Sequence, residues 1–316
     1  MKKAWLFLAA TGLLCAAEGS FERTLKTDGP VDLDVRTGAG NISVRTGSAG
    51  TLRVYATIRV SNRRLSESEA ADRVRRIEAN PPVEQTGNMI RIGQIDDREL
   101  REHLSIGFDI VAPSDTRLRA QTGSGNQTLE GLRGPVDAST GSGNLVISAI
   151  GDRVTATTGS GGIELNDVKG RVKATTGSGG IRAAAVAGPF SASTGSGNVR
   201  VSQTAPGDVE VGTGSGSIEV AGARGGLRAH SGSGSITVDG EPGAEWRVDV
   251  ASGSIRMRVP AQAAFDLQAR TGSGRISIDH PLTVRGQLSP RRIEGRVRNG
   301  GALVALSTAS GNITIE

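Results

Sequence analysis

The sequence predicts an all-β fold, a β-solenoid or parallel β-helix, and three observations lead to this prediction. A six-residue unit, [T/S]-G-S-G-[N/G/S]-[I/V/L], returns every 18 or 19 residues from Thr122 to Ser231. The residues around each unit alternate between apolar and polar, which is typical of strands with one buried face. The 46 glycines fall largely in this periodic motif, so the composition does not indicate low-complexity disorder.

The period itself indicates stacked coils. A repeat of this size means units that each bury one face against the next, as solenoid proteins do. The units begin at Thr122, Thr140, Thr158, Thr176, Thr194, Thr213 and Ser231, with degenerate copies at Val250, Thr271 and Thr308 and an early one at Thr37. We therefore predict a regular solenoid of coils of about 18 residues over positions 114–281.

Within a coil, two short strands flank the T-G-S-G corner. Segments such as 154–158 precede the corner and segments such as 163–165 follow it, both with apolar residues at alternate positions. A third apolar column follows at Leu132, Ile150, Val168 and Val186, and leaves open a brief third strand. Because alanine and threonine fill the inner columns, we expect a narrow bore packed with side chains and no channel.

The corner residues are expected to be structural. Glycine is predicted there because it adopts positive φ at sharp turns, and asparagine is its best substitute in that conformation. Stacked asparagine and serine side chains could also form hydrogen bonds from coil to coil. The fifth corner position carries Asn41, Asn126, Asn144, Gly162, Gly180, Asn198, Ser217 and Ser235.

The N-terminus is predicted to be a signal peptide, residues 1–19. Lys2 and Lys3 precede an apolar run over 4–14 and then small residues, and cleavage after Ala17 or Gly19 fits this pattern. A lipoprotein signal at Cys15 is disfavoured because the large Leu14 precedes that cysteine. No later segment approaches the ~18 apolar residues of a membrane span. We therefore expect export to the periplasm, the cell surface or the medium.

Both ends of the mature chain should differ from its middle. Residues 20–113 are predicted to form an N-terminal cap with partial coils, strands over 52–60, 89–92 and 104–111, and a helix over 66–79. Ser66 and Glu69 form a capping-box pattern at the start of this helix. Residues 282–316 are predicted to hold the C-terminal cap and last coil. There, Asn299-Gly300 predicts the turn of a β-hairpin over 297–303 that covers the open edge.

The chain offers little catalytic chemistry, and we predict no catalytic, cofactor-binding or metal-binding residue. Cys15, the only cysteine, lies in the signal, and the three histidines, His103, His230 and His280, are far apart in sequence. The neutral corner residues are not ligands for calcium. Without Lys2 and Lys3 the chain has 35 basic and 32 acidic residues, a net charge of +3. The two signs alternate along the chain, so nucleic-acid binding is not expected.

A polysaccharide-cleaving β-helix enzyme remains the alternative. The outward column of the second strand comprises Thr128, Val146, Glu164, Arg182, Arg200, Glu219, Thr237 and Arg256. No two carboxylates are adjacent in this column, although acids of neighbouring columns could still converge. Rows of outward threonine for ice binding begin at Thr155, Thr157 and Thr175 but are interrupted. Core positions are expected for Phe190, Trp246 and Phe265. A basic cluster of Arg285, Arg291, Arg292, Arg296 and Arg298 could meet an anionic surface or form a charged edge.

The corners, the signal peptide and the C-terminal stretch over 300–313 together resemble a bacterial family of exported β-strand-repeat domains of unknown function, often labelled "putative adhesin". The resemblance is strongest over 118–278 and at the C-terminus, and it implies a β-helix, export and no catalytic residues. Many relatives carry aspartate at the fifth corner position, where this chain has Asn, Gly or Ser. We therefore expect a non-enzymatic scaffold or adhesin-like surface at the cell envelope, with a polysaccharide or protein partner and no cofactor.

Overall fold

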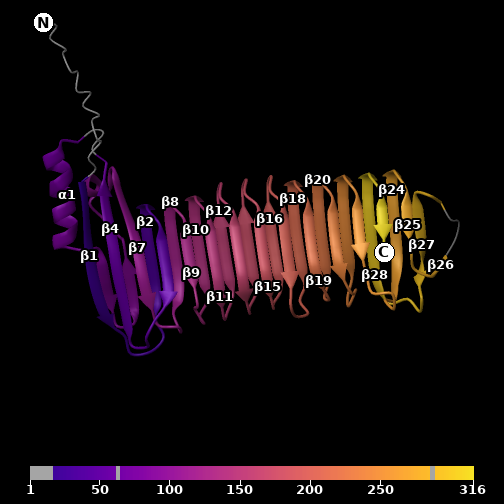
Figure 1. The fold of residues 1–316 in the computed structure, drawn as a ribbon, viewed down its shortest axis with the longest axis horizontal. Coiled ribbons are helices and arrows are strands. Elements are labelled where there is room, and N and C mark those ends of the chain that lie inside the picture. The colour runs from indigo at the N-terminus through magenta and orange to yellow at the C-terminus, as the bar shows by residue number, and fades with distance from the viewer. Residues whose placement is uncertain (1–16, 62–64, 285–288) are drawn as a thin grey trace, which may run out of the picture.

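The computed structural model describes residues 17–61, 65–284 and 289–316, which form an elongated stack of strands (Figure 1). The strands belong to two sheets, one of 14 strands, called sheet A here, and one of 15 strands, called sheet B. Through the repeats, consecutive strands alternate between the two sheets. The prediction of a nearly all-β fold with long runs of parallel strands is confirmed.

Each corner connects a strand of sheet B to a strand of sheet A. Partners in neighbouring coils lie 18 residues apart, as in Val136 with Val154, or 19 apart, as in Val199 with Ile218. The sheet B strands of this region are β8 (Arg117–Ser124), β10 (Val136–Ser142), β12 (Val154–Thr158), β14 (Val172–Thr176), β16 (Phe190–Thr194), β18 (Val209–Ser215), β20 (Leu227–Ser233) and β22 (Trp246–Ser252). Those of sheet A are β9 (Gln127–Glu130), β11 (Leu145–Ile150), β13 (Ile163–Val168), β15 (Ile181–Val186), β17 (Val199–Gln203), β19 (Ile218–Ala223), β21 (Ile236–Gly240) and β23 (Ile255–Arg258).

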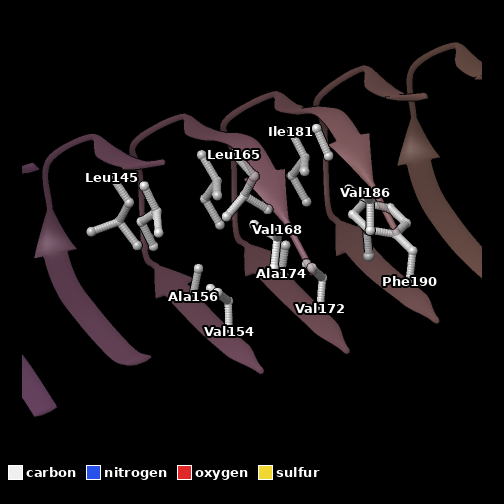
Figure 2. Close-up of a cluster of buried hydrophobic side chains, with 14 of the residues drawn as sticks. Leu145, Val154, Ala156, Leu165, Val168, Val172, Ala174, Ile181, Val186 and Phe190 are labelled. Atoms are coloured by element: carbon white, nitrogen blue, oxygen red, sulfur yellow. The ribbon is translucent and has the colours of Figure 1, made fainter. Parts of the chain in front are cut away.

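The core is the space between the two sheets. Figure 2 shows Leu165 and Ile181 of sheet A opposite Val172 and Phe190 of sheet B, with Ala174 beside them. All five are buried, and the same columns continue through the neighbouring coils. Small alanines in one column and branched or aromatic residues in the next let the two sheets approach closely, so side chains fill the bore.

The third apolar column belongs to the second strand and forms no strand of its own. Ile150, Val168 and Val186 are the last residues of β11, β13 and β15, and each is buried. The residue before each has a positive φ, between 53° and 54°, which turns the chain back toward sheet B; these are Ala149, Asp167 and Ala185. The same place in β19 is held by Gly222, with φ of 73°.

At nine corners, the leading hydroxyl residue is buried and donates a hydrogen bond to the preceding coil of the stack. The Thr176 hydroxyl donates to the Gly161 carbonyl at 2.8 Å, and the Thr194 hydroxyl donates to the Gly179 carbonyl at 2.8 Å. The same bond forms from Thr122, Thr140, Thr158, Thr213, Ser231, Thr271 and Thr308. A hydroxyl at this otherwise apolar inward position gives a corner carbonyl a partner, although Val250 occupies the same position in one coil without a hydroxyl.

We expect Thr176→Val to lower the free energy of unfolding by about 1–3 kcal/mol, since it keeps the shape but removes the hydroxyl. The Thr176 hydroxyl also accepts from the Gly179 N–H at 3.1 Å, so both groups lose a partner in a buried place. Thr175→Val is the matched control, because Thr175 is half-buried on the outward face and should change stability by less than ~0.5 kcal/mol. Urea titrations of both variants measure the difference. Equal midpoints would contradict a structural role for the hydroxyl.

Positive φ is not the reason for glycine in the central corners. Gly161, Gly177 and Gly179 do not lie in the positive-φ region, although Gly234 and Gly253 do, with φ of 143° and 148°. The common reason is close stacking of backbone on backbone. A Cβ on Gly177 would lie 2.5 Å from the Gly159 carbonyl oxygen, and one on Gly161 or Gly179 would overlap the corner of the preceding coil. Glycine is needed because a side chain would separate the coils.

The N-terminal cap extends sheet A with antiparallel strands. β1 (Ala17–Lys26), β4 (Thr51–Val60) and β7 (Leu104–Ala112) lie in this order beside β3 (Ile42–Thr46), which forms the first coil with β2 (Asp32–Ala39). β5 (Val83–Thr86) and β6 (Met89–Ile92) end sheet B. The three expected strands are thus present. Residues 1–16 of the predicted signal lie outside the described residues, while Ala17–Gly19 pair with Val60, Arg59 and Ile58.

The helix α1 (Glu67–Ala79) begins at its expected cap and packs against the outer end of sheet A (Figure 1). The Ser66 hydroxyl accepts from the Glu69 N–H at 3.3 Å. The Ser66 hydroxyl and the Ser66 backbone N–H both donate to the Glu69 carboxylate, and these two bonds lower the pKa of Glu69. Ala70, Val74 and Ile77 are its buried residues, as the sequence predicted. A short helix α2 (Arg98–Arg101) follows. Among the described residues, neither helix has the length and apolar character to cross a bilayer.

The C-terminal hairpin prediction is wrong. β27 (Arg292–Val297) and β28 (Ala302–Ser310), on either side of the Asn299-Gly300 turn, do not pair with each other. Instead they flank β24 (Phe265–Ser273), with β27 antiparallel on one side and β28 parallel on the other. β29 (Ile313–Ile315) likewise lies between β23 and β25 (Ile276–Ile278), and β26 (Leu282–Val284) forms the outer edge of sheet B.

The reason is the corner motif in the last segment. Thr308 donates to the Gly253 carbonyl at 2.8 Å, and Thr271 of the earlier segment donates to the Gly311 carbonyl at 2.8 Å. The last coil therefore stacks corner on corner between two coils that precede it in sequence. A turn signal specifies a local reversal of the chain and does not specify which strand fills the space beside it.

Candidate functional site

The outward face of sheet A contains a groove of about 710 Å³ that crosses β11, β13, β15, β17 and β19. Its wall is the corner column, including Asn144, Gly162, Gly180, Asn198 and Ser217, and its floor is the outward column beside it. The groove therefore runs along the axis of the stack, perpendicular to the strands.

The groove exists because a ladder of corner side chains is interrupted. The Asn126 side-chain oxygen accepts from the Asn144 N–H at 2.8 Å, and the Asn198 oxygen accepts from the Ser217 N–H at 2.8 Å. The predicted coil-to-coil hydrogen bonds are thus present. Between these steps stand Gly162 and Gly180, which carry no side chain, so the wall is lowered over two coils.

Neither glycine is required by the backbone. Gly162 and Gly180 are outside the positive-φ region, and a Cβ at either position would have its nearest neighbour at 3.5 or 3.4 Å, an ordinary contact. These two positions differ in this from the corner glycines just before them, where a side chain has no room. Their small size opens the groove and does nothing else that the fold requires.

The floor contains one exposed apolar side chain and four charges. Val146, Glu164, Arg182, Arg200 and Glu219 are direct neighbours in the strand register, as the outward column predicted. Val146 is 39% exposed. Arg200 forms an ion pair with Glu219 at 2.6 Å, whereas Glu164 and Arg182 have no ion pair within 4 Å in the described part of the chain.

The spacing of the carboxylates favours binding over glycoside cleavage. Glu164 and Glu219 are separated by three strand steps, or roughly 14 Å at ~4.8 Å per step. Both stereochemical classes of glycosidase need two carboxyl groups within about 5–9.5 Å. The groove can instead offer an acid, a base and an apolar contact in line, which suits recognition of an extended molecule.

Comparison with known proteins identifies the family. The sequence profile described as Toastrack DUF4097 matches residues 152–316, just over half of the chain. The protein belongs to the Toastrack DUF4097 family. The resemblance to a β-strand-repeat family of unknown function is therefore confirmed. No curated protein matches this Toastrack protein.

Three solved structures are similar to this Toastrack protein. A "putative cell adhesion protein" from Clostridium sporogenes is 10% identical, with 95% of this chain and 99% of that chain covered and a TM-score of 0.24. A "putative adhesin" from Bacteroides fragilis is 12% identical, with 94% and 97% covered and a TM-score of 0.29. A "putative adhesin" from Parabacteroides distasonis is 9% identical, with 94% and 97% covered and a TM-score of 0.28.

The histidines of this Toastrack protein lie away from the groove. His103 and His230 are exposed, and the His230 ring lies over Gly212 of the neighbouring strand, in space that a larger residue there would need. His280 is half-buried beyond β25. In the described ranges, no three His, Cys, Asp or Glu side chains come together as a metal site would require. Phe190, Trp246 and Phe265 are buried core residues, as predicted.

The C-terminal arginines form individual contacts, and no continuous basic patch. Arg292 pairs with Glu294 at 2.7 Å, and Arg296 pairs with Asp266 at 3.4 Å. Arg298 donates to the Ala261 carbonyl at 2.7 Å, and Arg291 is exposed. Arg285 lies outside the described residues. Of these contacts, the Arg296–Asp266 pair joins β27 to β24, and the interpretation as a charged protective edge fits better than an anion-binding surface.

Sequence reasoning included the groove residues but missed their effect. The sequence predicts Gly162 and Gly180 only as turn formers, because glycine is expected at corners. The signal available was the difference between them and the asparagines at the same place in the neighbouring coils. Tyr55, the one tyrosine, falls at an outward position of a predicted strand, and its 48% exposure in the folded structure marks it as a second candidate.

Proposed function

We propose that this Toastrack protein is an exported, non-enzymatic adhesin-like protein whose groove on sheet A holds an extended polymer of the cell envelope or its surroundings. Export is proposed from the signal pattern at 1–19. The polymer, a polysaccharide or an extended protein segment, lies along the stack axis and crosses several coils. The protein thereby serves as a rigid scaffold with a lateral binding face.

One observation carries this proposal: the corner ladder is open at the two coils where glycine is not structurally needed. Asn126, Asn144 and Asn198 show that asparagine suits this column and adds a hydrogen bond to the next coil. Glycine at 162 and 180 gives up that bond and gains only the opening of the groove. A stabilising contact exchanged for an accessible surface is typical of a binding site.

The experiment restores the missing wall. We expect Gly162→Asn with Gly180→Asn to keep or raise the melting temperature, because each side chain can accept from the next coil as its neighbours do. Binding to immobilised envelope polysaccharides and to purified cell-wall sacculi should fall at least about tenfold, since the side chains occupy the groove. Ser235→Asn is the matched control, because Ser235 belongs to the same column but does not line the groove.

Two results would contradict the proposal. Unchanged binding by the filled variant would show that the groove is not the contact surface. Release of new reducing or unsaturated ends from a polysaccharide, abolished by Glu164→Gln, would instead favour the enzyme alternative. Glu164 is the test residue because its carboxylate has no ion-pair partner within 4 Å in the described ranges.

A further inference from the structure

Tyr55 is the only aromatic side chain on the surface of the described residues. It lies at an outward position of β4 and is 48% exposed, whereas the other described aromatics, Phe21, Phe108, Phe190, Trp246 and Phe265, are buried. The sequence contains no other tyrosine. An aromatic ring held on a rigid sheet and left open to solvent is a platform for a ligand with an apolar face.

A trough of about 710 Å³ surrounds this ring. It crosses β4, β7, β3 and β9, where Tyr55, Asp109, Ser43 and Thr128 follow one another in the strand register. Gly107 is beside Thr57 and leaves the trough open; a Cβ there would meet its nearest atom at 3.7 Å, so the fold does not demand glycine.

The polar groups around Tyr55 are hydroxyls, amides, the Arg59 guanidinium and one carboxylate without an ion pair. Asp109 has no ion pair within 4 Å among the residues that the structure describes, and it faces Tyr55 directly across the strand pair. Ser43, Thr57, Ser105, Asn41 and Asn126 complete the lining. Such groups form hydrogen bonds with ligand hydroxyls in both directions, which suits a polyhydroxylated ligand.

The charges favour an uncharged ligand over a cation. Glu22 and Asp109 flank Tyr55 on the neighbouring strands, but Arg53 and Arg59 flank it on its own strand. Arg59 also lines the trough and is paired with Glu18 at 3.0 Å. With Glu18 counted, these five side chains carry one net negative charge, which is too little for the field to select strongly for a lysine side chain or another ammonium group.

We propose that Tyr55 and Asp109 form a subsite for a neutral pyranose ring. The C–H face of the sugar stacks on the Tyr55 ring, and a sugar hydroxyl donates to the Asp109 carboxylate, with hydroxyls of Ser43 and Thr57 beside it. The site shares no lining residue with the groove over β11–β19. The Tyr55 subsite can therefore be tested independently of that groove.

The single tyrosine makes the test specific. Protein labelled with 3-fluorotyrosine gives one ¹⁹F resonance, which we titrate with maltohexaose, cellohexaose and chitohexaose to about 10 mM, above the ~1 mM Kd of a weak site. A saturable shift with at least one of these oligosaccharides, and none with hexalysine, is expected. Absence of any sugar-dependent shift, or a shift with hexalysine alone, would overturn the sugar assignment, the latter result indicating a cation site.

Three variants, two at Tyr55 and one at Asp109, separate the roles of ring and carboxylate. By calorimetry with the best of these sugars, Tyr55→Phe should keep affinity within about threefold, and Tyr55→Ala should abolish measurable binding. Asp109→Asn should weaken binding about tenfold or more, because a charged hydrogen bond is replaced by a neutral one. Both positions are exposed, so folding should be unaffected. Full binding by Tyr55→Ala would refute stacking of the sugar on the ring. As a control, the fluorine shift should be undiminished in the Gly162→Asn/Gly180→Asn protein, which shows that the sugar binds outside the groove over β11–β19.

Discussion

Removing residues 302–316 should unfold the C-terminal part of the stack, although only the last 15 residues are lost. β28 and β29 lie between the coil of β22 and β23 and the coil of β24 and β25, so the deletion empties an internal position. β24 would keep only its antiparallel partner β27, and the buried Val304 and Leu306 would leave a gap beside Trp246. Loss of two such side chains alone costs several kcal/mol, on the order of 2–5 each.

Trp246 reports this change directly, because it is fully buried, its indole N–H donates to the Gly225 carbonyl, and its neighbour in the last coil is Val304. In the chain that lacks residues 302–316, we expect a red shift of the Trp246 fluorescence emission and new protease cleavage within 259–297. Both results would indicate local unfolding. The control deletes 159–176, an 18-residue coil, and joins Thr158 to Gly177 so that T-G-S-G is restored. That chain should fold with a modest loss, since solenoid stability is roughly a sum over repeats and interfaces. If the truncated chain is as stable as this control, β28 and β29 do not form an internal coil between the coil of β22 and β23 and the coil of β24 and β25.

The regular coils could be predicted because their signals are local. Alternation of apolar and polar residues marks the strands, and the Ser66–Glu69 pattern marks the start of α1 at its observed place. The order of coils at the C-terminus could not be predicted in this way. Thr271 and Thr308 both begin valid corners, and either segment could stack on the coil of β22 and β23. The packing of whole coils and the antiparallel pairing of β27 with β24 determine which of the two segments stacks there.

The candidate sites were harder to predict for a related reason. The groove forms where side chains are missing from neighbouring coils, as at Gly162 and Gly180. Sequence patterns identify the side chains that are present, so they do not show such a space. Tyr55 and Asp109 lie 54 positions apart in sequence and meet only because β7 pairs antiparallel with β4. The outward column from Thr128 to Arg256 could be predicted, because its register follows from the period alone.

Two adjacent glycines should respond in opposite ways to the same substitution. Gly161→Ala places a Cβ against the Gly143 carbonyl, so the coils must separate at this corner. The hydrogen bond from Thr176 to the Gly161 carbonyl would be strained by the same displacement. We expect a loss of at least about 2–3 kcal/mol in the free energy of unfolding, as for an overpacked core. Gly162→Ala meets only ordinary contacts from 3.5 Å, and should leave stability unchanged or raise it by ~0.4–1 kcal/mol.

Urea unfolding of the two variants, with circular dichroism to verify β-structure, measures this contrast. The pair is informative because strand propensity and unfolded-state entropy are nearly the same for two adjacent glycines, while Gly161 is buried in the stack and Gly162 is half-buried. The difference therefore isolates the contact between successive corner backbones. A large loss for both variants would mean that glycine conformation, and not stacking, is what the corner requires. In that case Gly162 would be structurally necessary, and the argument that its small size serves the groove would fail with it.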